Sequence, residues 1–72
     1  MVNKKLLLNL IKEKGLKQKF LAEKLGITYQ AFNNKINNLS EFTVSEAYEI
    51  ANLLDIRGSI LECEIFLSDL DT

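Results

Sequence analysis

Amide side chains are concentrated in one short stretch near the middle of the chain, and their chemistry suits specific recognition. They are Gln30, Asn33, Asn34, Asn37 and Asn38, preceded by the aromatic Tyr29. An amide can donate and accept hydrogen bonds together, which matches the N6 and N7 atoms of adenine in the major groove of DNA. The alternative is that these amides are solvated, or that they cap helix ends.

Two short helices joined by a tight turn are expected to position these side chains. The sequence QKFLAEKLGITYQAFNNKINN predicts a helix over about residues 18–25 and a second over about 29–37, with Thr28 as its N-cap. Gly26 between them can adopt the left-handed conformation without a Cβ penalty. Such a pair lays one helix in the major groove while the other crosses the backbone, so we predict sequence-specific binding to double-stranded DNA.

The rest of the chain also reads as helical. Asn3 can cap a first helix that ends at Gly15, and Thr43-Val-Ser-Glu46 is a capping box that opens a fourth helix. The predicted apolar faces are Leu6, Leu7, Leu10 and Ile11 in the first helix, and Val44, Ala47, Ile50, Ala51 and Leu54 in the fourth.

The last segment is compatible with two kinds of secondary structure. Ser59-Ile-Leu-Glu62 resembles a second capping box and favours a C-terminal helix over about 59–67. The alternation of apolar and polar residues from Leu61 to Ile65 would also suit a half-buried strand. We expect the helix, because a cap signal stands at its start and four helices precede it.

Length and composition predict one small domain spanning residues 1–72, with a core over 4–56. The apolar runs are too short to cross a membrane, and the N-terminus lacks the features of a signal peptide. The single cysteine, Cys63, cannot form an internal disulfide, which fits a cytoplasmic location; we expect it in the core.

The charges are segregated along the chain. Residues 1–38 carry eight Lys and two Glu, a net charge of +6, whereas residues 39–72 carry one Arg and eight acidic residues, a net charge of −7. A molecule with two poles can present its basic half to a polyanion despite an overall charge of −1. The alternative is a chance segregation of ordinary solvated charges.

At this point a family resemblance is apparent. The sequence LKQKFLAEKLGITYQAFNNKINN, followed by FTVSEAYEIANLLDI, resembles the helix-turn-helix domain of the XRE family, which includes phage Cro proteins and repressors. The resemblance implies an all-α, compact, five-helix, lambda-repressor-like domain that binds operator DNA as a homodimer. A regulator of the phage or prophage type would then read a pseudo-palindromic site with its third helix.

The resemblance also implies roles for individual residues. Base contacts are expected from Tyr29, Gln30, Asn33 and Asn34. Phosphate contacts are expected from Gln18, which opens the second helix, and from Lys17, Lys19, Thr28, Lys35 and Asn37 near helix ends. Because the third helix carries no Arg, the usual reader of guanine, we expect an A·T-leaning half-site. Any single lysine is better explained as an ordinary solvated charge, and the expectation concerns the set as a whole.

Two positions depart from the family pattern. Lys35 followed by Ile36 reverses the usual order of an apolar and then a polar residue, so we expect Ile36 to point inward and Lys35 outward. Asn38 stands in place of the family's glycine after the third helix, and Asn tolerates the left-handed conformation.

Other functions fit less well. The chain has no His and one Cys, and it shows neither a Gly-rich phosphate loop nor metal-ligand spacing, so we expect no enzyme, metal site, cofactor or small-molecule ligand. Apolar residues of the last segment (Ile60, Leu61, Ile65, Phe66, Leu67 and Leu70) would either form a dimer face or close the domain's own core. The competing function is an antitoxin-like or anti-repressor module that binds protein and has weak or no DNA binding.

Overall fold

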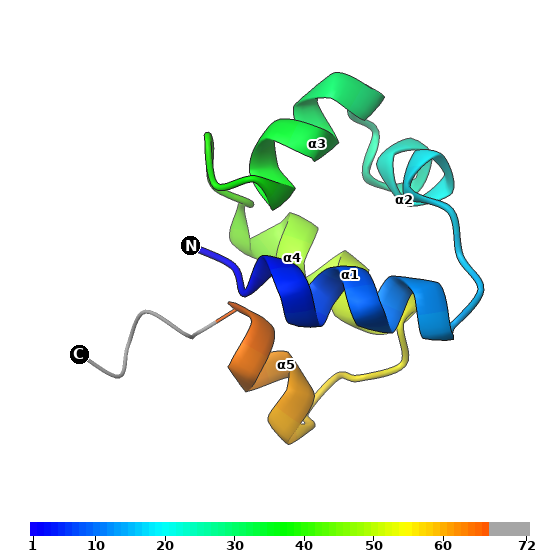
Figure 1. Cartoon of the computed structure of the whole chain (residues 1–72), viewed down its shortest axis with the longest axis vertical. Helices are drawn as coiled ribbons and strands as arrows, with labels where there is room; N and C mark the ends of the chain where they lie inside the picture. The colour runs from blue at the N-terminus through cyan, green and yellow to red at the C-terminus, as the bar shows by residue number, and fades with distance from the viewer. Residues whose placement is uncertain (67–72) are drawn as a thin grey trace.

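Five helices follow one another in residues 1–66, the part of the chain that the computed structural model describes (Figure 1). They are α1 (Lys4–Glu13), α2 (Gln18–Leu25), α3 (Tyr29–Ile36), α4 (Val44–Leu53) and α5 (Ile60–Phe66). Residues 1–66 contain no strand, so the predicted all-α fold is confirmed and the strand alternative for the last segment is wrong as far as Phe66. The expected end of that helix at Leu67, and the apolar residue Leu70 that follows it, lie outside the described residues.

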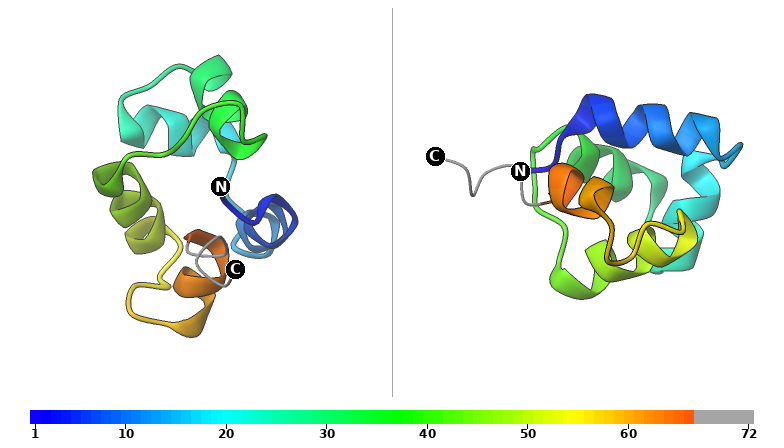
Figure 2. Two further views of the ribbon diagram at one scale, coloured as in Figure 1. Left: turned by 90° about the vertical axis from the view of Figure 1, so that its left-hand side faces the viewer. Right: turned by 90° about the horizontal axis from the view of Figure 1, so that it is seen from below.

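The helices form two groups. α2 and α3 lie together at one end of the molecule, and α1 and α5 lie at the other (Figures 1 and 2). α4 contacts α2, and α1 contacts α5. The side chains at the centre come from all five helices, and the largest fully buried ones are Leu7, Leu21, Phe32, Ile36, Ile50, Leu54 and Ile65.

Phe42, in the loop between α3 and α4, connects the two groups. Its ring lies edge-on to Phe32 of α3, with centroids 5.9 Å apart, and edge-on to Phe66 of α5 at 6.2 Å. Edge-to-face pairs add stabilisation beyond the area they bury. The loop after the third helix is therefore part of the packing.

Two predictions of burial are wrong. Val44, expected in the apolar face of α4, is 88% exposed because it is the first residue of the helix and stands at the edge of the core. Cys63, expected in the core, is exposed. It precedes the fully buried Ile65 by two residues, which places it on the opposite side of α5.

Side chains cap the helix starts largely as expected. Oδ1 of Asn3 accepts the N–H of Leu6 at 3.1 Å, and Thr43 forms both bonds of a capping box with Glu46. The second predicted box is only half formed. Oγ of Ser59 accepts the N–H of Glu62, but the Glu62 carboxylate accepts the N–H of Gly58, because the N–H of Ser59 is bonded to the carbonyl of Ile56.

Candidate nucleic-acid interface

The turn between α2 and α3 fixes the angle at which the two helices meet. Gly26 adopts a left-handed conformation with φ 72°, and the N–H of Ile27 donates to the carbonyl of Ala22 at 3.1 Å. This bond spans the end of α2 as in a Schellman motif and reverses the chain within two residues. Ala22 and Phe32 are buried where the helices cross, which leaves the opposite face of α3 outside.

The outer face of α3 carries the amides. Phe32 and Ile36 point into the core, while Gln30 is exposed and Asn34 is half-buried one turn away. Nε2 of Gln30 donates to Oδ1 of Asn34 at 3.1 Å. This bond leaves the carbonyl oxygen of Gln30 and the amide hydrogens of Asn34 available to a ligand. Tyr29 begins the same helix and is 44% exposed.

The other two amides of the helix bond to each other. Nδ2 of Asn37 donates to the backbone oxygen of Asn33 at 2.9 Å and to its Oδ1 at 3.1 Å. Asn37 thus adds a second donor to the Asn33 carbonyl, which already accepts the backbone N–H of Asn37. This is the capping role that the sequence left open. The two bonds commit both hydrogens of Nδ2, so the phosphate contact expected of this exposed residue would require it to give up one of them.

Lys35 does not point outward as expected. Its ammonium group forms an ion pair with Glu46 of α4, and the side chains are only 15% and 14% exposed. The ammonium also lies 6.0 Å from the centre of the Phe42 ring. Ile36 takes the inward position that was predicted for it, but the side chain of Lys35 points towards α4 and is paired with Glu46. This arrangement does not suit the expected phosphate contact.

Glu46 is held as a carboxylate by its neighbours. Burial acts to raise the pKa of Glu46, but the ion pair with Lys35 and the bonds from Thr43 outweigh it and lower the pKa below its ordinary value of 4.5. Glu46 therefore serves two elements at once, since it closes the capping box of α4 and holds the last turn of α3. The sequence revealed only the first role, because the second depends on a contact between helices.

The start of α2 carries polar side chains and unbonded backbone groups. Lys17 is the N-cap, but its side chain makes no capping bond, so the first N–H groups of the helix lack a side-chain partner. Lys17 and Lys19 are exposed, and Gln18 is half-buried between them. At the start of α3, Oγ1 of Thr28 accepts the N–H of Ala31 at 3.0 Å, which leaves its hydroxyl hydrogen free to donate.

Among residues 1–66 there is no group of three or more potential metal ligands. Within the same residues, none of the helices combines the length and the apolar character that a membrane span requires.

A bent pair of helices with an outward amide face defines a helix-turn-helix domain. The family model described as helix-turn-helix matches residues 7–61, which is most of the chain. The chain therefore belongs to the helix-turn-helix family of the XRE type, whose members are DNA-binding transcription regulators. Comparison with curated proteins and with solved structures gives no significant match.

Proposed function

We propose that the chain is a repressor of the phage or prophage type that binds an A·T-leaning, pseudo-palindromic operator as a homodimer, with α3 in the major groove. The observation that carries the proposal is the outer face of α3, where Gln30 and Asn34 stand clear of the core. Surface helices commonly carry charges on this face. Here the face carries amides, which read base edges.

The composition of that face supports a preference for A·T pairs. Gln and Asn can each make a bidentate pair with adenine, worth about 1–3 kcal/mol against a wrong base. The exposed ring of Tyr29 can contact a thymine methyl group. The only cation of α3, Lys35, is paired with Glu46, so the face lacks the Arg or Lys that usually pairs with guanine.

Phosphate contacts are proposed for the groups around the starts of the two helices. Lys17, Gln18 and Lys19 lie where unbonded N–H groups and the helix dipole favour an anion. Thr28 offers a hydroxyl at the start of α3, and Asn37 offers an amide at its end. Lys35 is left out of this set because of its ion pair.

The dimer is proposed because one recognition helix reads too few base pairs to be selective. Two half-sites about 10 base pairs apart are the usual solution. α5 supports this with exposed apolar side chains, since Ile60 is 77% exposed and Leu61 is 36% exposed. Ile65 of the same helix is fully buried in the domain's own core. One side of α5 therefore packs against the core, and the other side exposes apolar side chains that a second copy of the chain could cover.

The proposal is tested by binding to the DNA that flanks the chain's own gene, followed by selection of sites from random DNA. Gln30→Ala and Asn34→Ala should each weaken binding to the selected site, and the site should be rich in A·T pairs. Asn52→Ala removes an exposed amide from α4 and serves as the control. Selection of G-rich sites, or equal loss of binding in the control, would contradict the proposed reading.

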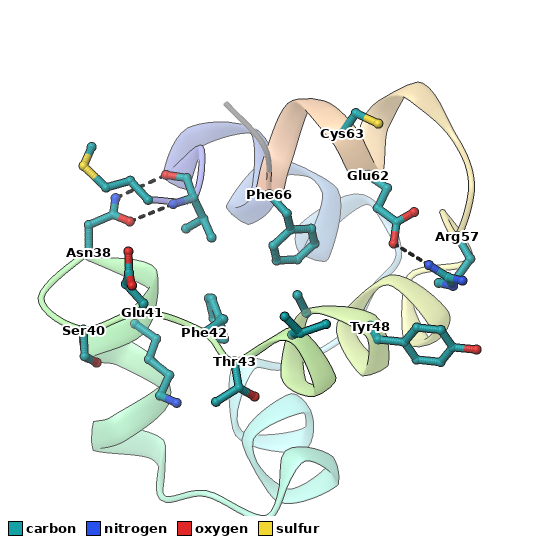
Figure 3. A pocket seen from close by; sticks show the side chains of 15 residues that line it. Asn38, Ser40, Glu41, Phe42, Thr43, Tyr48, Arg57, Glu62, Cys63 and Phe66 are labelled. Atoms are coloured by element: carbon teal, nitrogen blue, oxygen red, sulfur yellow. Dashed lines mark hydrogen bonds and ion pairs between the residues drawn. The ribbon is translucent and has the colours of Figure 1, made fainter. Parts of the chain in front are cut away.

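One observation favours the alternative of a protein-binding module. A groove of about 470 Å³ lies between α4, α5 and the loop after α3, with Phe42 and Phe66 among its lining residues (Figure 3). Val44 and Tyr48 are exposed beside it. Exposed apolar groups around a groove are typical of interaction sites. Absence of any DNA shift at low salt would favour this antitoxin-like or anti-repressor function.

A further inference from the structure

The residue after the third helix makes contacts that its backbone conformation does not require. Asn38 has a left-handed conformation with φ 64°. Its N–H donates to the carbonyl of Lys35 at 3.2 Å, and the next N–H, of Leu39, donates to the carbonyl of Asn34 at 2.8 Å. These bonds close the end of α3, and glycine would make them at least as well, because a side chain carries a cost in this conformation.

The side chain of Asn38 reaches a distant part of the chain. Its Oδ1 accepts the N–H of Val2 at 2.8 Å, and its Nδ2 donates to the carbonyl of Val2 at 3.2 Å (Figure 3). One carboxamide thus satisfies both backbone groups of a single residue, as a neighbouring strand would. Val2 is itself buried, at 9% exposure, so the paired groups are partly shielded from water.

The same segment continues to two other helices. The N–H of Asn3 donates to the carbonyl of Ile65 in α5 at 2.8 Å, and the Asn3 side chain caps α1. Residues 2 and 3 therefore join the end of α3 to the start of α1 and to α5. In this way the helix that carries the amide face is bonded to the group of helices at the other end of the molecule.

We propose that Asn38 is a positioning residue for DNA recognition, whose carboxamide fixes the end of α3 against Val2 and thereby sets the orientation of α3 relative to α5. The inference rests on the proposed function of α3. Contact with DNA is not required of Asn38 itself. Its side chain acts by keeping the face formed by Gln30 and Asn34 at one angle to the rest of the domain.

The chain offers a matched control for a test by substitution. Asp55 follows α4 with φ 60°, and the bonds that close that helix follow the same pattern, from Asp55 to Asn52 and from Ile56 to Ala51. Within the described residues the Asp55 side chain makes no hydrogen bond or ion pair. Asn38→Gly and Asp55→Gly therefore relieve the same backbone cost, and only the first removes side-chain bonds.

We expect the two variants to behave in opposite ways. Asp55→Gly should raise or maintain the melting temperature and leave DNA binding unchanged. Asn38→Gly should increase the amide hydrogen exchange of Val2 and Asn3 by roughly 30-fold, the usual worth of two neutral hydrogen bonds. It should also weaken operator binding by about threefold to tenfold, because fewer molecules hold α3 in the binding orientation. Affinity for non-specific DNA, which depends on charge, should not change.

Both the hydrogen-exchange measurement and the DNA-binding measurement can contradict the proposal. An Asn38→Gly variant that matches Asp55→Gly in exchange and in operator affinity would overturn the proposal. Equal losses on operator and on non-specific DNA would also overturn it, since they would indicate a general loss of folded protein. If the unmodified chain binds no operator, the proposed function fails, and with it the positioning role; faster exchange at Val2 would then show only that the bonds exist.

Discussion

Gln30 and Asn34 are joined on the outer face of α3 by a hydrogen bond of 3.1 Å from Nε2 to Oδ1. The two residues are one helical turn apart, so their side chains lie one above the other. The bond therefore orients both amide groups in the protein without bound DNA. A side chain that is already ordered loses less conformational entropy when it binds.

This bond leads to a prediction about a double-mutant cycle. Gln30→Ala and Asn34→Ala should each weaken operator binding by about 1–3 kcal/mol, the usual worth of a bidentate base contact. The double variant should lose less than the sum, by about 0.5 kcal/mol or more, because either substitution removes the shared bond. Fluorescence anisotropy with operator DNA measures all four affinities. Strict additivity would indicate that the two amides act independently.

Salt dependence should report on the lysines at the start of α2. If each monomer neutralises about three phosphates, the logarithm of a dimer's affinity should fall with the logarithm of salt concentration at a slope of roughly −5. Lys17→Ala or Lys19→Ala should make the slope shallower by about 2 in a dimer, one unit for each monomer. Lys12→Ala, an exposed lysine in the last turn of α1, is the control. A slope near zero in the unmodified chain would exclude electrostatic positioning.

The stability of the domain should fall in acid because of Glu46. Its pKa in the folded state is lower than the ordinary value of 4.5, so protonation favours the unfolded chain. The contribution is complete above about pH 5.5 and is lost as the pH falls through 4.5 towards the folded pKa. Glu62 acts in the same direction, because the N–H of Gly58 and the guanidinium of Arg57 lower its pKa. Urea unfolding between pH 3 and 7 measures the effect.

The substitution Glu46→Gln distinguishes the ion pair with Lys35 from the capping box with Thr43. Glutamine can still accept the N–H of Thr43, but it cannot neutralise Lys35. The variant should be less stable than the unmodified chain at pH 7, and the difference should shrink below pH 4. Glu23→Gln removes a charge from an exposed position of α2 and provides the comparison. Identical pH profiles for Glu46→Gln and the unmodified chain would show that the ion pair adds no stability.

Two isoleucines of α5 should give contrasting results. Ile65→Ala should destabilise the domain by about 2–5 kcal/mol, because the side chain is fully buried. That is a large share of the roughly 4–11 kcal/mol expected for a chain of this size. Ile60→Ala should change monomer stability by less than about 0.5 kcal/mol, because Ile60 is exposed.

Sedimentation of the same two variants tests the dimer. If α5 contributes to an interface between copies, Ile60→Ala should raise the dissociation constant while the monomer stays folded. An unmodified chain that sediments as a monomer, both alone and with operator DNA, would remove the dimer from the proposed function.

Local patterns were sufficient to predict the helices. Thr43 and Glu46 are three residues apart, and a cap of this kind is decided by neighbours along the chain. The left-handed conformation of Asn38 was predicted for the same reason. Asp55 adopts that conformation too, and it was not predicted because Asp carries a weaker signal than Gly or Asn.

Contacts between helices were not predictable from the same patterns. The ion pair of Lys35 with Glu46 and the bonds of Asn38 to Val2 depend on how separate elements pack. Periodicity gives the side of a helix that faces inward, but it does not give the depth of the core at the helix end. That is why Ile36 was placed correctly and Val44 was not. The roles of the amides of α3 in DNA binding remain predictions.

The ion pair that engages Lys35 has a consequence for how the domain can change over time. Since the only charged side chain of α3 is bound to Glu46, general attraction to DNA must come from other elements, such as the lysines beside α2. If Gln30 and Asn34 read bases as proposed, substitutions at these two positions would change the preferred sequence without changing the general affinity for the duplex. Sequence specificity and general affinity for DNA could then evolve separately. For the same reason, this face of α3 is a practical starting point for redesign towards new operators.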